Sequence, residues 1–251
     1  MLSSNKPNLR KGNVTVPEKH PNCICGNERY CQCDDITLAL GEKLDRLNET
    51  ISWQDALERL KAGNERYVSM TRRPNPGVCH YTRKLLCKGQ WPFATILCCS
   101  DSRVPPEIIF DAGLGDLFIV RVAGNVIDSK LLGSIEYATL HSTSRLILVM
   151  GHEFCGAVNA AVHSVENPET SHTAGINDII RQLMPAVLKA QKGNDISGED
   201  LVDSAARENV RMVCRTILEN SVPLRNLAAK NEIKVMGAYK LLSSGEVEFF
   251  E

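Results

Sequence analysis

The sequence lacks three features, each of which would place a protein in a large class at once. Its 29 lysines and arginines nearly balance its 30 aspartates and glutamates, and the formal net charge is -1. There is therefore no overall basic field to attract nucleic acid or an anionic membrane surface. No apolar run approaches the roughly 18 residues that a membrane-spanning helix needs. The first 20 residues also contain no apolar stretch of the length found in secretion signals.

These absences favour a globular protein that works in the cytoplasm, with no nucleic-acid or membrane partner. Residues 1–17 are basic and contain no acidic residue, so import into an organelle stays open as an alternative. A chain of 251 residues, of which 43% are hydrophobic, has enough apolar side chains for one sizeable α/β domain with an appendage.

Cysteine, in contrast, is abundant, with 10 residues in the chain. In a short secreted protein this would indicate disulfides, but this chain is long and shows no export signal. Metal binding or catalysis is therefore the better interpretation. Several of the cysteines stand in the polar, proline-containing residues 1–50, which we interpret as an N-terminal extension of a catalytic domain at residues 51–251. The clustered cysteines of the extension are Cys23, Cys25, Cys31 and Cys33.

Three states are open for this cluster: free or redox-active thiols, a reducible disulfide pair, or a second metal site. The C-x-C spacing differs from the C-x-x-C pairs of common zinc ribbons, in which both thiols reach one ion. We therefore favour free or redox-active thiols. We expect that deletion of residues 1–50 leaves the catalytic metal site intact.

Beyond residue 51, short apolar runs alternate with amphipathic stretches. Predicted strands cover 92–99, 116–124, 145–151 and 232–241, with a hairpin-like return at 247–250. Predicted helices begin after Ser52 and cover 105–113, 129–141 (capped by Ser129), 155–166, 174–191 and 198–219. The alternation predicts an α/β fold, with a mostly parallel central β-sheet flanked by helices and an N-terminal helical arm. In such sheets, ligands bind beyond the carboxyl ends of the strands.

Two polar motifs follow predicted strands at this edge. CSDSR occupies residues 99–103 and HEFC occupies residues 152–155. Two thiolates and an imidazole, from Cys99, His152 and Cys155, form a ligand set that suits Zn²⁺. Three protein ligands leave a fourth position open, as in catalytic zinc sites. Each residue alone would be an ordinary structural one, and the combination is what indicates a metal site.

Asp101 and Arg103 stand beside the first of these cysteines. Arg103 can hold Asp101 in a bidentate pair, and Asp101 can then orient a water at the metal rather than bind the metal itself. The ordinary alternatives are helix capping for Asp101 and a surface charge for Arg103. Cys98 is expected to be a small buried residue, because neighbouring strand residues point to opposite faces.

The motifs CSDSRV and HxxCGA resemble those of the β-class carbonic anhydrases, with FIVRVAGN (118–125) and GSIEY (133–137) between them. The match runs from about Gln90 to Val162. The resemblance implies an α/β fold and a homodimer or a larger assembly of dimers. It also implies zinc held by Cys99, His152 and Cys155, and hydration of carbon dioxide to bicarbonate and a proton by zinc-bound hydroxide.

The same resemblance assigns a catalytic role to Asp101 and Arg103 and substrate contacts to Gln90, Phe118 and Tyr137. These three substrate contacts are implied to face the zinc of the other subunit. Some family members bind bicarbonate at an inhibitory site that uses a tryptophan and an arginine. Here Ile96 replaces the tryptophan and Arg121 stands at the arginine's place, so an open site is expected.

Two other functions compete with this interpretation. A carbonyl sulfide or carbon disulfide hydrolase would use the same zinc chemistry on a different linear molecule, because pocket shape decides between such substrates. A non-catalytic zinc-binding scaffold would have lost a ligand or the Asp–Arg pair, and all five residues are present here.

Overall fold

The computed structural model describes residues 50–73, 82–83, 86–192 and 196–251. The cysteine cluster at residues 23–33, and the division of the chain at residue 50, therefore depend on residues outside the described part and stay predictions. The elements in chain order are α2 (Trp53–Val68), β1 (Ala94–Cys98), α4 (Pro106–Ile109), β2 (Leu117–Arg121), η1 (Ala123–Asn125), α5 (Ser129–His141), β3 (Leu146–His152), α6 (Gly156–Glu166), α7 (Ala174–Gln191), α8 (Gly198–Asn220), α9 (Val222–Ala229), β4 (Lys234–Lys240) and β5 (Val247–Phe250).

The strands form one five-stranded sheet in the order β2-β1-β3-β4-β5. The pairs β1–β2, β1–β3 and β3–β4 are parallel, and only the edge strand β5 runs antiparallel to its neighbour β4. The α/β prediction is thus confirmed, including the return strand after β4. β1 and β3 are buried along their whole length, which explains why both read as unbroken apolar runs in the sequence.

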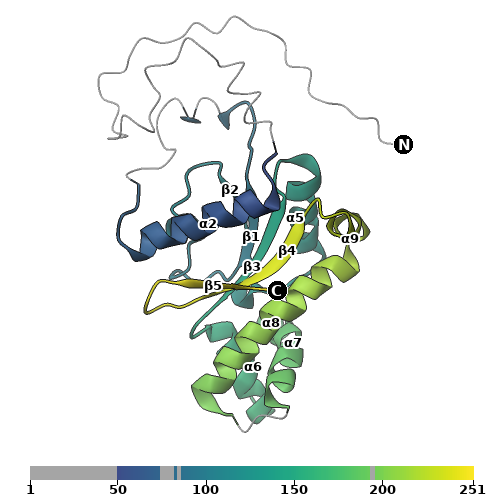
Figure 1. Ribbon diagram of the computed structural model, residues 1–251. Coiled ribbons are helices and arrows are strands. Elements are labelled where there is room, and N and C mark those ends of the chain that lie inside the picture. The colour runs from purple at the N-terminus through teal and green to yellow at the C-terminus, as the bar shows by residue number, and fades with distance from the viewer. Residues whose placement is uncertain (1–49, 74–81, 84–85, 193–195) are drawn as a thin grey trace, which may run out of the picture.

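The two faces of the sheet carry separate hydrophobic clusters. Alternate residues of β1 point to opposite faces, so Ile96 and Cys98 join the cluster that includes α2, α6 and α7, while Leu97 joins the one that includes α5 and α9. The long helix α8 contributes to both clusters. Figure 1 shows α2 crossing the sheet and α6, α7 and α8 gathered at one end of it.

Of the two helix caps predicted from the sequence, one is confirmed and one is wrong. Ser52 caps α2 as predicted, because its hydroxyl accepts a hydrogen bond from the backbone N–H of Asp55. The cap of α5, however, is Asp128 and not Ser129: its carboxylate accepts from the N–H groups of Lys130 and Leu131. The short helix α9 was not predicted, although Ser221 caps it.

α2 packs so closely against the backbone at Phe110 that its residue 63 must be glycine. A Cβ built on Gly63 would lie 1.9 Å from the backbone oxygen of Phe110. We expect Gly63→Ala to lower the free energy of unfolding by about 1–3 kcal/mol, the usual penalty of overpacking. Gly133 is the matched control, because nothing lies within 4 Å of a Cβ added there in α5. Gly133→Ala should be neutral or stabilising. Urea unfolding curves of both variants check this, and equal midpoints would contradict the packing argument.

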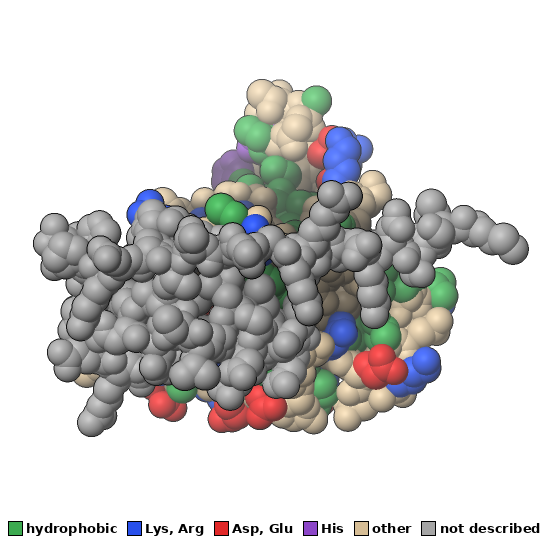
Figure 2. All heavy atoms as spheres, turned by 90° about the horizontal axis from the view of Figure 1, so that it is seen from above, with side chains coloured by type: hydrophobic (Ala, Val, Ile, Leu, Met, Phe, Trp, Pro, Cys, Tyr) green, Lys and Arg blue, Asp and Glu red, His purple; other side chains and the backbone are tan. Residues whose placement is uncertain are grey.

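Charge on the described surface is mixed. Where described side chains are visible in Figure 2, basic and acidic groups lie interspersed. Within the described ranges, every helix is either too short or too polar to cross a bilayer.

Candidate metal centre

Three candidate ligands converge at the carboxyl edge of the sheet. Cys99 follows the last residue of β1, His152 ends β3, and Cys155 is the N-cap of α6. Their ligand atoms all lie within 4.8 Å of one another, and all three residues are buried. β1 and β3 are neighbouring parallel strands, so the sheet itself brings together residues that are 53 positions apart. Within the described part of the chain, this is the one His/Cys/Asp/Glu group close enough to hold a metal.

The imidazole of His152 is oriented as a metal ligand would be. Its Nδ1 lies 2.8 Å from the backbone oxygen of Glu153, a contact that places the ring proton on Nδ1. Its Nε2 is buried and has no hydrogen-bond partner among the described residues. A buried nitrogen lone pair without a donor is costly unless a cation fills the place beside it. The residues present therefore fit Zn²⁺, with the second nitrogen fixed by a backbone carbonyl.

A hydrogen bond between the thiols of Cys99 and Cys155 moves their pKa values in opposite directions. A hydrogen bond with Cys155 lowers the pKa of Cys99 from 9.0 to about 4. That same bond, together with burial, raises the pKa of Cys155 well above its ordinary value. A dication in the site would favour the deprotonated form of both sulfurs, because a bound metal requires deprotonated sulfur. The backbone N–H of Gly124 also donates to Cys99 Sγ over 3.3 Å.

Cys98 takes no part in the cluster. It is fully buried in β1, on a face of the sheet where it packs among aliphatic side chains. Burial raises the pKa of its thiol to about 12, so it stays protonated. The prediction of a small buried residue is confirmed.

Asp101 and Arg103 form the bidentate pair that the sequence predicts. Arg103 Nε donates to Asp101 Oδ1 over 2.9 Å, and a terminal nitrogen donates to Oδ2 over 2.7 Å. These hydrogen bonds lower the pKa of Asp101 from 3.8 to about 2. Arg103 also donates to the backbone oxygen of Phe154, which lies between the ligands His152 and Cys155. The pair thus connects the two ligand segments.

Comparison with known proteins identifies the family. The profile of a family described as carbonic anhydrase matches residues 94–247. "Carbonic anhydrase 2" of Mycobacterium tuberculosis is 39% identical over 191 residues, which cover 76% of this chain and 89% of that protein. The chain belongs to the β-carbonic anhydrase family.

Two solved β-carbonic anhydrases have the same fold. The β-carbonic anhydrase CcaA is 26% identical, with a TM-score of 0.62, covering 79% of this chain and 87% of that one. A β-carbonic anhydrase described as tetrameric, from the filamentous ascomycete Sordaria macrospora, is 23% identical, with a TM-score of 0.61, covering 78% of this chain and 96% of that one. The relatives of this chain are thus enzymes named as carbonic anhydrases, which are carbonate dehydratases.

Of the three predicted substrate contacts, Phe118 can be placed relative to the metal cluster of its own chain. Phe118 pairs in register with Thr95, four residues before Cys99 along β1, which is about 13 Å of strand. The centroid of its ring lies 6.4 Å from that of Tyr137. Tyr137 lies on α5 and is 54% exposed. Gln90 is exposed in the loop before β1. Phe118 is therefore separated from Cys99 of its own chain by most of the length of β1.

Two contacts to the cluster were not predicted. One is the N–H of Gly124 on Cys99 Sγ; the other is Arg121, which donates to the backbone oxygens of Cys99 and Asp101. Gly124 has a φ of 69°, and a Cβ there would meet Leu183 and Ala157 at 3.0 and 3.1 Å. A glycine three residues after the end of β2 is the signal that could have indicated close approach of this backbone to the site.

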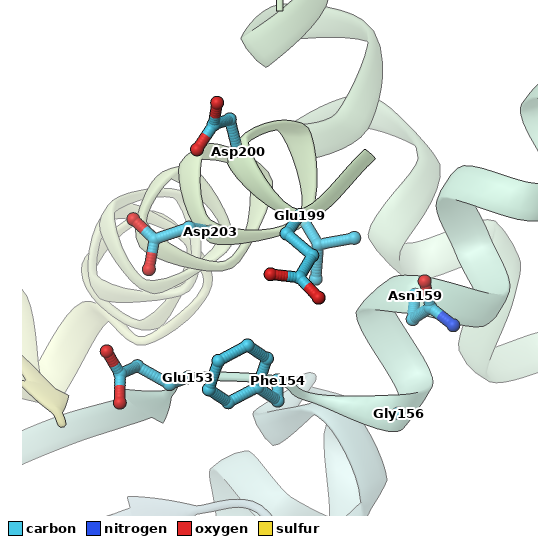
Figure 3. A pocket seen from close by; sticks show the side chains of 8 residues that line it. Glu153, Phe154, Gly156, Asn159, Glu199, Asp200 and Asp203 are labelled. Carbon is cyan, nitrogen blue, oxygen red and sulfur yellow. The ribbon is translucent and has the colours of Figure 1, made fainter. Parts of the chain in front are cut away.

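An acidic cavity of about 410 Å³ is lined in part by Glu153 and Phe154, from the segment that joins His152 to Cys155. Figure 3 shows Glu153 and Phe154 on one side of it and Glu199, Asp200 and Asp203 on α8 opposite. Glu153 accepts a hydrogen bond from the N–H of Leu242 over 2.6 Å. Because carboxylates line this cavity, it would repel an anionic reactant such as bicarbonate.

Proposed function

We propose that this protein catalyses the zinc-dependent, reversible hydration of carbon dioxide to bicarbonate and a proton. The observation that carries the proposal is the buried Cys99–His152–Cys155 cluster with the Asp101–Arg103 pair beside it. The family of the chain supports the same reaction. A carboxylate held next to a three-ligand site is the arrangement that an activated water requires.

Cys99, His152 and Cys155 would hold Zn²⁺ through two sulfurs and Nε2. When bound there, Zn²⁺ supplies a Lewis acid that lowers the pKa of water to roughly 7. The carbonyl of Glu153 keeps the imidazole in the required tautomer, and the N–H of Gly124 reduces the negative charge at Cys99 Sγ. These backbone groups fix the ligands before the metal binds.

Asp101 accepts a hydrogen bond from the attacking water and so orients its lone pair toward carbon dioxide. Arg103 occupies both carboxylate oxygens and keeps Asp101 ionised, with a pKa of about 2. A carboxylate that is so weak a base does not retain a proton at neutral pH. The proton released with each bicarbonate therefore passes on to buffer, and Asp101 serves orientation rather than storage.

The enzyme is proposed to act as a homodimer, or as a larger assembly of dimers, in which Gln90, Phe118 and Tyr137 bind substrate at the partner's metal site. Two facts support this: Phe118 is about 13 Å of strand from the cluster of its own chain, and Tyr137 and Leu140 expose apolar surface on one helix. The Sordaria macrospora protein is described as tetrameric. Carbon dioxide is apolar, so an aromatic wall suits it.

This arrangement makes a prediction about Tyr137. Tyr137→Glu should shift the protein toward the mass of a single chain and lower the hydration rate by about tenfold or more, because it places a charge in a buried interface. Ile176→Glu on α7 is the matched control, since Ile176 is a similarly exposed apolar residue on another helix. Light scattering after gel filtration, together with the rate, checks both. A dimeric, fully active Tyr137→Glu protein would contradict the shared site.

The function itself is tested by stopped-flow hydration of carbon dioxide with metal-analysed protein. We expect one zinc per catalytic domain and a rate that disappears with the metal. Carbonyl sulfide and carbon disulfide are assayed in parallel, because motifs do not separate these substrates. Fully zinc-loaded protein that leaves carbon dioxide unhydrated would refute the proposal.

A further inference from the structure

Arg121 reaches across from β2 to the turn that follows β1. It is the last residue of β2 and pairs in register with Cys98. Its Nε donates to the backbone oxygen of Cys99 over 3.0 Å, and a terminal nitrogen donates to that of Asp101 over 2.6 Å. One guanidinium therefore contacts the main chain of a metal-ligand candidate and of the neighbouring carboxylate residue.

The main chain around these contacts continues the pairing of the two strands. The N–H of Val122 donates to Cys98 O over 3.2 Å, and the N–H of Ser100 donates to Val122 O over 3.3 Å. Beyond Ser100 the chain turns away from β2. There the side chain of Arg121 provides the hydrogen bonds, to the backbone oxygens of Cys99 and Asp101. Hydrogen bonds from a charged guanidinium are stronger than neutral ones, and a planar fork fixes direction as well as distance.

The two residues that Arg121 holds are those whose placement the proposed reaction needs. Holding the carbonyl of Cys99 restrains the backbone from which its Cα–Cβ bond leaves, and the Sγ at the end of that side chain lies within 4.8 Å of the ligand atoms of His152 and Cys155. The carbonyl of Asp101 fixes the backbone of a side chain that Arg103 holds separately. Asp101 is thus held at two places by two arginines, one at its main chain and one at its carboxylate.

We propose that Arg121 is a positioning residue that sets the Cys99–Asp101 turn, so that the thiolate faces the metal and the carboxylate stays on Arg103. This rests on the proposed function. Its action is geometric: the fork must reach two carbonyl oxygens at once. A positive charge alone, placed at the same point, does not replace it.

The test compares Arg121→Gln and Arg121→Lys in the full chain, with Co²⁺ in place of Zn²⁺. The visible bands of Co²⁺ report the number and kind of its ligands, so they respond to a displaced thiolate or to an approaching carboxylate. Both variants should show altered bands and a 10- to 100-fold lower hydration rate, the range expected when a group that orients a ligand is lost. Lysine should not rescue, because it cannot reach both oxygens.

Arg145 provides the control. It also donates to a backbone oxygen, that of Thr139 over 3.0 Å, near the start of β3 at the other end of the strands. Arg145→Gln should leave the Co²⁺ bands as they are in the parent protein. If Arg121→Gln unfolds, Arg121→Lys alone decides, since it keeps the charge and the aliphatic stem.

Two results would overturn the inference. Unchanged Co²⁺ bands in both Arg121 variants would show that the turn holds its shape without the guanidinium. Full recovery of rate and spectrum by lysine would show that only charge matters, as in an anion-binding role. The spectrum is recorded without substrate, so it decides this point even if the parent protein fails to hydrate carbon dioxide. Failure of the inference and failure of the proposed function are therefore separable.

Discussion

Cys155→Ala should lose both its metal and its activity. Cys155 would supply one of the two sulfur ligands, and it is the N-cap residue of α6. Removing an orienting neighbour of a ligand lowers metal affinity by about 10- to 100-fold. Removing the ligand itself should exceed that range, so the purified variant should contain little zinc. Metal analysis after dialysis, with stopped-flow rates on the same samples, measures both effects.

Cys98→Ala is the control for this variant, because it removes a neighbouring buried thiol that is not one of the three grouped ligand candidates. It should keep its zinc and its rate, with a loss of stability of about 1 kcal/mol from the vacated space. Thermal melting adds a readout that does not depend on activity. A ligand that binds the folded state raises the melting temperature. A chelator should therefore lower the melting temperature of the parent and of Cys98→Ala, but not that of Cys155→Ala.

A Cys155→Ala protein with full zinc and full rate would show that the metal is held elsewhere. Loss of zinc from Cys98→Ala but not from Cys155→Ala would exchange the roles of the two thiols. Binding should also weaken as the pH falls, because both sulfurs must be deprotonated to bind.

The sequence predicts the ligand set because its residues lie at or just beyond the ends of two fully buried strands. β1 and β3 have apolar side chains on both faces, so the runs end sharply, and Cys99 and His152 stand where they end. Parallel neighbours then bring these ends together. The Asp101–Arg103 pair is equally local, with one residue between its members. Short spacings between residues and the hydrophobic pattern of a strand are the features that can be predicted most directly from a single sequence.

Contacts between segments that are distant in the sequence were harder to predict. Arg121 and Gly124 reach Cys99 across 22 and 25 positions, and the choice of carbonyl or sulfur depends on the path of the chain after β2. The cap of α5 was misassigned by one residue, because Asp128 and Ser129 are both good caps and only the extended backbone of Asp128 decides between them.

α9 was overlooked for a different reason. It spans 8 residues, too few for a clear helical period, and begins one residue after α8 ends. The proposed roles of Phe118 and Tyr137 depend on a second chain, which the sequence of one chain does not describe. Within one chain, Phe118 packs against a hydrophobic cluster of the sheet, and the ring of Tyr137 lies near those of Phe118 and His141.

Asp101→Asn should keep its zinc and lose most of its activity. The amide has nearly the same shape, but it carries no charge and presents an N–H₂ group to one of its neighbours. It can no longer accept from the attacking water and at the same time satisfy both Arg103 donors. A misplaced reactant slows a reaction by about 10²-fold, so a fall of roughly 100-fold is expected.

The pH dependence of this variant has a definite sign. The carboxylate of Asp101 is ionised well below neutral pH, since its pKa is about 2. A negative charge near the attacking water disfavours ionisation of that water, and the unpaired Arg103 of the variant favours it. The midpoint of the pH–rate profile should therefore move to lower pH in Asp101→Asn, even as the maximal rate falls.

Asp128→Asn is the matched control for this change. It is the same aspartate-to-asparagine replacement at the cap of α5, where asparagine serves as well as aspartate. It should leave the zinc content, the rate and the pH midpoint unchanged. An Asp101→Asn enzyme with the parent's pH–rate profile would show that Asp101 has no part in the reaction. Loss of zinc from that variant would show that Asp101 holds the metal site in shape instead. Its carboxylate also accepts a hydrogen bond from the backbone N–H of Arg103, within the turn after β1.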